Sequence, residues 1–131
     1  MKILGIRTDW ALNEYRKLHD TYGGIGYYRI HKPLQTLGQE TIGKAISGLA
    51  TYDDLIDGYD AVIVKPLDNE AGAKLIYTCL KKGVKLIIDM DDNLFEGRES
   101  HEFYNELAPG AKKRKIVSAF CSFADAMICS T

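Results

Sequence analysis

Four short apolar runs, none with the spacing of a helical stripe, constrain this chain more than any other feature. Continuous runs of this kind, rather than alternating ones, are typical of strands buried on both faces of a parallel sheet. The runs span residues 2–7, 62–64, 86–88 and 126–129. A shorter strand is expected near residues 40–42. The sequence therefore predicts a sheet of buried parallel strands.

Helical periods fill the gaps between these runs. One apolar stripe ends before Gly83, which we expect to close the helix, and Asp68 is its expected N-cap. The members of this stripe are Leu67, Ala71, Leu75, Ile76, Cys79 and Leu80. A second stripe consists of Ile116, Val117, Phe120, Phe123 and Ala124. A helical turn or two is expected over residues 52–56.

Helical spacing also recurs around Pro33, between the first two predicted strands. The apolar members there are Tyr27, Ile30, Leu34 and Leu37. Because proline cannot donate a hydrogen bond to the preceding turn, Pro33 predicts a kink or the start of a fresh turn. The alternation of strands and helices predicts a Rossmann-like α/β fold. Its open parallel sheet would have about five strands with helices on both faces, in three α/β/α layers.

Composition excludes several classes of protein. The 131 residues fit one domain, which we place at residues 1–131. The 17 lysines and arginines and the 18 acidic residues give a net charge of -1, which argues against a protein built mainly to hold nucleic acid. No apolar run approaches the roughly 18 residues of a membrane span. The apolar part of the N-terminus is too short for a signal peptide.

Cysteine and histidine positions predict neither a disulfide framework nor a metal site. Cys79, Cys121 and Cys129 stand among apolar neighbours and form no C-x-x-C pair. We interpret them as reduced thiols in the core, which places the protein in the cytoplasm. The three histidines, His19, His31 and His101, are scattered without metal-ligand spacing.

A glycine-rich segment, Gly23-Gly24-Ile25-Gly26-Tyr27-Tyr28-Arg29, precedes the predicted helix around Pro33. Glycines let the backbone approach a ligand closely, and the start of a helix offers N–H groups and a positive dipole end to a phosphate. Arg29 lies one turn further on and adds a fork of donors. A flexible turn with a surface arginine is the competing interpretation.

An acidic segment, Asp89-Met90-Asp91-Asp92-Asn93, follows the apolar run at residues 86–88. It lies at the carboxyl end of a predicted strand, where open α/β sheets bind ligands. Its carboxylates repel one another unless they meet a cation, hydrogen-bond donors or a proton-transfer task. A solvated loop is the interpretation without a function.

Three functional interpretations of the acidic segment compete. It resembles the nucleophile loop of haloacid-dehalogenase-type phosphatases, the D-x-D of GT-A-type glycosyltransferases and a cleft-lining loop of GT-B-type glycosyltransferases. The phosphatase motif normally lies on the first strand and continues Gly-Thr, whereas Asp92-Asn93 stands here. The chain that follows is also too short for that family's later motifs or for the rest of a GT-A fold.

The basic run Lys112-Lys113-Arg114-Lys115 opens the last predicted helix. These cations oppose the positive end of the helix dipole, so we expect them to be exposed or to face an anion. A solvated face is one interpretation. Contact with a phosphate-bearing acceptor, nucleic acid included, is the other.

Three segments together resemble the N-terminal domain of a GT-B-type glycosyltransferase, of the group common in bacteria and phages. They are the glycine-rich segment with Pro33 and Leu34, residues 85–95, and residues 123–131. In that family a Gly-rich loop follows the first strand, a D-x-D-D-x-L loop follows the fourth, and A-D-x-x-x-x-S-T forms the fifth strand and its end. The resemblance spans the whole chain in the family's order.

This resemblance implies a transferase that moves a sugar from a nucleotide-sugar donor to the hydroxyl of a glycan, a small molecule or a modified nucleic acid, without a bound metal. Near the donor diphosphate or the sugar it places Gly23, Gly24, Ile25, Gly26 and Tyr27. Arg29 would neutralise phosphate charge. Asp91 or Asp92 would orient the acceptor hydroxyl or accept its proton.

The family continues into a second domain that carries most of the nucleotide contacts. The resemblance therefore implies that this chain is the acceptor-side half of the enzyme, and we predict that it folds alone but has little transferase activity. The alternative is a stand-alone Rossmann-like module that holds a nucleotide or a partner protein without catalysis. A phosphatase is the third possibility.

Overall fold

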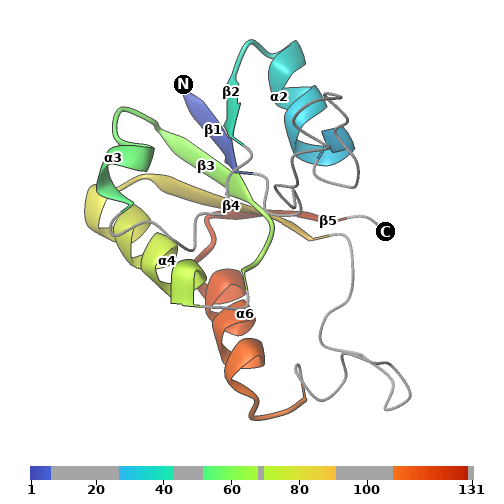
Figure 1. Ribbon diagram of the computed structural model, residues 1–131, viewed down its shortest axis with the longest axis vertical. Coiled ribbons are helices and arrows are strands. Elements are labelled where there is room, and N and C mark those ends of the chain that lie inside the picture. The colour runs from blue at the N-terminus through green and yellow to red at the C-terminus, as the bar shows by residue number, and fades with distance from the viewer. Residues whose placement is uncertain (7–26, 43–51, 68–69, 91–107, 130–131) are drawn as a thin grey trace, which may run out of the picture.

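A five-stranded parallel sheet forms the centre of the molecule. The computed structural model describes residues 1–6, 27–42, 52–67, 70–90 and 108–129. The sheet has the order β2-β1-β3-β4-β5, and every neighbouring pair is parallel (Figure 1). The strands are β1 (Ile3–Ile6), β2 (Glu40–Ile42), β3 (Ala61–Val64), β4 (Lys85–Met90) and β5 (Ala126–Cys129). The predicted Rossmann-like α/β fold is confirmed.

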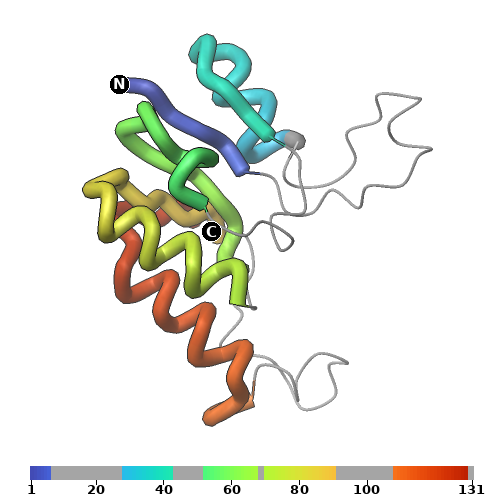
Figure 2. Tube along the Cα trace, turned by 60° about the vertical axis from the view of Figure 1, so that its left-hand side comes forward, coloured from blue at the N-terminus to red at the C-terminus, as the bar shows by residue number. Residues whose placement is uncertain are grey.

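Helices cover both faces of this sheet, which confirms the three predicted layers. One face carries α3 (Asp53–Ile56), α4 (Glu70–Lys82) and α6 (Lys112–Phe123). The other face carries the π-helix η1 (Tyr27–His31), which continues into α2 (Lys32–Thr36). Figure 2, turned about the vertical axis, shows the same separation of α2 from α4 and α6.

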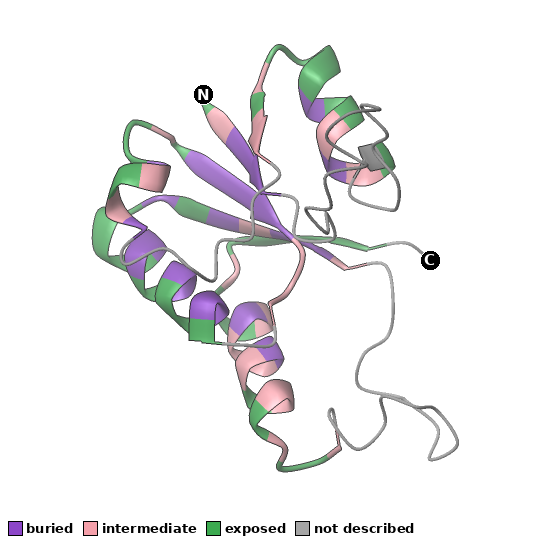
Figure 3. Cartoon of the chain, in the orientation of Figure 1, coloured by how far each residue is buried: buried purple, intermediate pink, exposed green. Residues whose placement is uncertain are grey.

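The larger core lies between the sheet and the first of these faces. Alternate strand residues point into it, as the two-residue period of a strand requires. On the three inner strands they are Leu4, Ile6, Val62, Val64, Leu86 and Ile88. Figure 3 shows that β3 is buried along its length, which confirms the strand predicted at residues 62–64 as buried on both faces. From the helices, Leu75 of α4 and Phe120 of α6 are fully buried against these strands.

The smaller core lies under η1 and α2. Ile30 and Leu34 are buried against Ile63 of the central strand β3. Gly5 of β1 allows this close approach, because a Cβ there would lie 2.5 Å from Cδ1 of Leu34 and 2.8 Å from Cγ2 of Ile30. The glycine therefore sets how near η1 and α2 can lie to the sheet.

Predicted helix boundaries agree with the structure at two residues. Pro33 lies in the first turn of α2, where its missing N–H is not needed, so the predicted fresh turn is confirmed. Gly83 has a φ of 70° directly after α4 and closes that helix as expected. The short helix expected near residues 52–56 is α3. Asp68, the expected N-cap, lies outside the described residues.

Three members of the apolar helical spacings are exposed, namely Leu80, Phe123 and Leu37. Leu80 is 56% exposed, because a helix turns about 100° per residue and Leu80 points about 120° away from the centre of its stripe. Phe123 is the final residue of α6, and Leu37 follows the end of α2. Both residues lie at or just beyond a helix end, where a side chain extends past the surface that the helix covers.

The prediction that the last strand is buried on both faces was also wrong. All four residues of β5 are exposed, Met127 and Ile128 among them. The reason is position in the sheet, since β5 lies at the edge of the sheet that the described residues form, beside β4. An apolar run identifies a strand but does not reveal whether that strand lies at the centre or at the edge.

The three thiols differ in their surroundings. Cys79 is buried in α4, and this burial raises the pKa of its thiol to about 11, as expected of a core cysteine. Cys121 is half-buried, and burial raises the pKa of its thiol as well. Cys129 is exposed on β5, so its predicted place in the core was wrong for the same reason as that of its strand.

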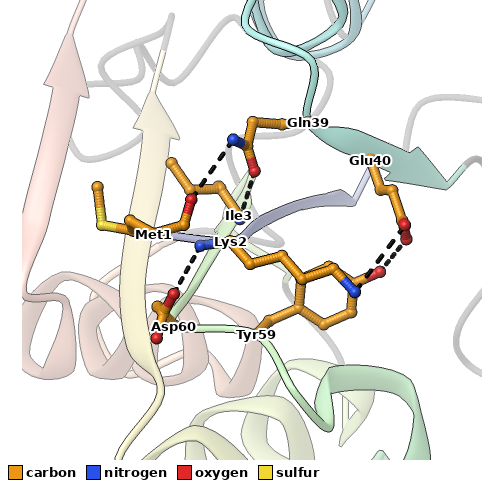
Figure 4. Close-up of polar contacts among 7 residues, drawn as sticks. All are labelled: Met1, Lys2, Ile3, Gln39, Glu40, Tyr59 and Asp60. Atoms are coloured by element: carbon orange, nitrogen blue, oxygen red, sulfur yellow. Dashed lines mark hydrogen bonds and ion pairs between the residues drawn. The ribbon is translucent and has the colours of Figure 1, made fainter.

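A polar network holds the amino-terminal edge of the sheet (Figure 4). The backbone N–H of Lys2 donates to the carboxylate of Asp60 at 2.6 Å. The Lys2 ammonium lies 4.4 Å from the centre of the Tyr59 ring and 3.9 Å from Glu40. The Tyr59 hydroxyl donates to the Glu40 carboxylate, and this bond raises the pKa of Tyr59 to about 12.

We predict that Glu40→Gln lowers the pKa of Tyr59 from about 12 toward 10.0, since the amide carries no charge to oppose the phenolate. The bond stabilises the protein below pH 10.0, and that contribution falls as pH rises to about 12. Absorbance titration of tyrosinate measures the change, with Tyr59→Phe identifying which transition belongs to this residue. An unchanged transition in Glu40→Gln would show that Glu40 does not hold the phenol.

We also predict that Gly5→Ala destabilises the protein by about 1–3 kcal/mol, because the added methyl group forces Leu34 and Ile30 away from the sheet. Urea denaturation measures the loss in the free energy of unfolding. The same substitution in a Leu34→Ala background removes the nearest clash and is expected to have a smaller effect. Equal effects in both backgrounds would contradict the packing described here.

Candidate functional site

A charged pair joins two segments that are 60 residues apart in the sequence. The Nε atom of Arg29 donates to both carboxylate oxygens of Asp89 at 2.9 Å, and Nη2 also donates to Oδ1. The Asp89 side chain is 1% exposed, whereas that of Arg29 is 24% exposed. Two adjacent guanidinium nitrogens therefore hold one buried carboxylate, in a geometry that fixes the plane of the guanidinium group.

The pair lies near the carboxyl ends of the central strands. Asp89 is the penultimate residue of β4, and its neighbour Ile88 is level with Val64, the last residue of β3. Because side chains alternate along a strand, Asp89 shares a face with Ile87, which packs against the smaller core. In a sheet of this order the strand order reverses between β1 and β3, and ligands bind beside the carboxyl ends of the strands at such a point.

Arg29 is positioned by the π-helix η1. The next residue, Ile30, is buried and packs against the sheet, so the backbone of this turn is anchored. A second contact connects the same turn to β2, where Nδ1 of His31 lies 2.5 Å from Oγ1 of Thr41. Single π-helical turns recur at functional sites in proteins. The sequence predicted a helix here but not its π geometry.

The structure describes only part of the predicted site. Gly23, Gly24, Ile25 and Gly26 lie outside the described residues, as do Asp91 and Asp92. Tyr27 begins η1. The contact that the structure does describe joins the end of the glycine-rich segment, at Arg29, to the start of the acidic segment, at Asp89.

Asp89 is the residue whose role the sequence analysis missed, since it entered there as one carboxylate of the acidic segment and not as the partner of Arg29. A carboxylate that directly continues a buried apolar run was the available signal, because such a group requires a partner. The structure supplies that partner, because the oxygens of the buried Asp89 carboxylate accept hydrogen bonds from Arg29.

The predicted basic contacts lie elsewhere. Lys112 is exposed at the start of α6, where its Nζ is 3.5 Å from the Glu70 carboxylate. Lys113 and Arg114 follow it and are half-buried. Both views place the start of α6 at the bottom of the molecule and η1 near the top (Figures 1 and 2). The structure therefore does not bring the basic run to Arg29.

Within the described ranges, no group of three or more histidine, cysteine or acidic residues is placed to hold a metal ion. No helix in the same part of the chain is long and apolar enough to cross a membrane. Comparisons with protein-family models, curated proteins and solved structures gave no significant match. The fold and the geometry of the charged pair are therefore the observations from which a function is inferred.

We predict that Arg29→Met lowers the free energy of unfolding by about 3–5 kcal/mol, because it leaves the Asp89 charge buried without its partner. The double variant Arg29→Met/Asp89→Leu removes both charges and is expected to lose much less. Urea denaturation near neutral pH measures both.

Lys85→Met is the matched control, since it removes one member of the exposed Lys85–Asp125 pair, whose atoms are 2.9 Å apart. Its expected effect is below about 1 kcal/mol. A loss in Arg29→Met no larger than that of the control would contradict a buried, tightly held pair.

Proposed function

We propose that the chain is the acceptor-side domain of a cytoplasmic glycosyltransferase that uses a nucleotide-sugar donor. The observation that carries the proposal is the bond between Arg29 and Asp89. It joins the glycine-rich and the acidic segment, each of which the sequence analysis identifies separately as a candidate ligand-binding segment. The parallel sheet supports the proposal because its carboxyl edge is where such folds bind ligands.

The proposed chemistry requires a proton acceptor, a backbone segment close to the donor and a cation beside the phosphates, all at this edge of the sheet. The oxygen of an acceptor hydroxyl attacks the anomeric carbon of the donor sugar, and the bond from that carbon to the diphosphate oxygen breaks. The nucleoside diphosphate leaves, and the hydroxyl proton passes to Asp91 or Asp92. Residues 23–27 lie near the diphosphate or the sugar in this scheme, and Arg29 offsets phosphate charge.

A second domain completes the site in this proposal. It carries most of the nucleotide contacts, so the 131-residue chain alone is expected to show no turnover. The acceptor is a glycan, a small molecule or a modified nucleic acid. The basic residues Lys112, Lys113 and Arg114 are the proposed contacts for a phosphate-bearing acceptor, outside the immediate surroundings of Arg29.

The test is transfer by this chain expressed together with any coding sequence that follows it. A panel of nucleotide sugars and acceptors is screened for release of nucleoside diphosphate that depends on the acceptor. Asp91→Asn and Asp92→Asn are each tested, and the variant that removes the proton acceptor is expected to lower the rate about 10²–10⁴-fold.

Lys81→Gln is the control, because Lys81 is an exposed residue of α4 that pairs with Asp53. It is expected to leave the rate unchanged. Turnover by the 131-residue chain alone would contradict the need for a second domain. Nucleotide binding without transfer, in a protein that encodes no second domain, would instead identify a stand-alone binding module.

A further inference from the structure

Asp89 is the one charged side chain that is buried among the described residues. Removing a carboxylate and a guanidinium from water costs several kcal/mol for each ion, and apolar residues of similar volume often stabilise a fold equally well. Stability alone therefore does not account for a carboxylate at this position. The geometry that the carboxylate imposes on its partner is the remaining property.

That geometry fixes one side of the Arg29 guanidinium while the side chain still reaches solvent. Nε and Nη2 are held by the buried carboxylate of Asp89, and the side chain of Arg29 remains 24% exposed. Because the guanidinium is planar, two bonds on one edge determine the direction of the whole group. A lysine ammonium has no such plane and would not be oriented in this way.

We propose that Asp89 is a positioning residue that holds Arg29 in the orientation needed to bind a phosphate group at the carboxyl edge of the sheet. This inference rests on the proposed function only for the kind of ligand, the diphosphate of a nucleotide sugar. Arg29 contacts the phosphate, and Asp89 acts through Arg29 from the buried side.

The effect of charge and the effect of orientation predict opposite results for one variant. Asp89→Asn removes a negative charge near the ligand, which by charge alone strengthens the binding of an anion. The same variant loses one acceptor oxygen and places an amide donor toward the guanidinium, which disturbs its orientation. Weaker binding by this variant therefore reports positioning and not charge.

The experiment measures the affinity of the chain for inorganic pyrophosphate by titration calorimetry. The unmodified chain is expected to bind saturably, and Asp89→Asn and Arg29→Lys are each expected to bind about tenfold more weakly, which is about 1.4 kcal/mol. Asp125→Asn is the matched control. It alters an exposed carboxylate that accepts from the Leu86 N–H at the opposite end of β4, and it should leave the affinity unchanged.

A second measurement keeps the proposal testable if Asp89→Asn fails to fold. The Nε–H signal of Arg29 in nitrogen-15 NMR, assigned by its loss in Arg29→Lys, is expected to be protected from exchange with solvent. It should also shift as pyrophosphate is added. Absence of saturable binding, tighter or unchanged binding by Asp89→Asn, or an Nε–H signal that does not move would each overturn the proposal.

The two proposals fail separately. Glycosyl transfer by a protein whose Arg29 and Asp89 variants bind pyrophosphate normally would overturn the positioning role alone. Weakened pyrophosphate binding in those variants, without transfer to any acceptor, would overturn the proposed function alone.

Discussion

The buried carboxylate of Asp89 imposes a constraint that shapes one whole face of this molecule. It cannot be solvated at its place in β4, so a donor must come from another element, and the π-helix η1 supplies Arg29. The smaller core also holds η1 against the sheet, because Ile30, the residue after that arginine, packs on the sheet. The charged pair and the apolar contacts thus fix η1 together.

The two faces of the sheet differ in what they bury. The face under α3, α4 and α6 holds the larger of the two apolar cores that the described residues form. The face under η1 and α2 holds a small cluster, admitted by Gly5, and the charged pair. A buried ion pair contributes little net stability compared with apolar residues of similar volume, but it fixes the relative positions of its two side chains. A site on the face with the smaller core can therefore be polar, because the larger core on the other face stabilises the fold.

Much of the architecture was predictable because local rules govern it. Pro33 and Gly83 mark the start and the end of helices through restrictions on their own backbones. The run at residues 62–64 predicted a strand buried on both sides, which β3 is. The same rule was wrong for β5, because its exposure depends on the order of strands in the sheet. That order results from contacts between distant parts of the chain.

In the candidate site, too, some features follow from local sequence and others from contacts between distant parts of the chain. Backbone preferences and apolar periods act over a few residues, so they predict most of the helices and strands and draw attention to Arg29. The burial of Asp89 and its pairing with Arg29 follow instead from how the chain folds, because a charge inside the protein must find a partner by position in space, and the two residues are 60 positions apart along the chain.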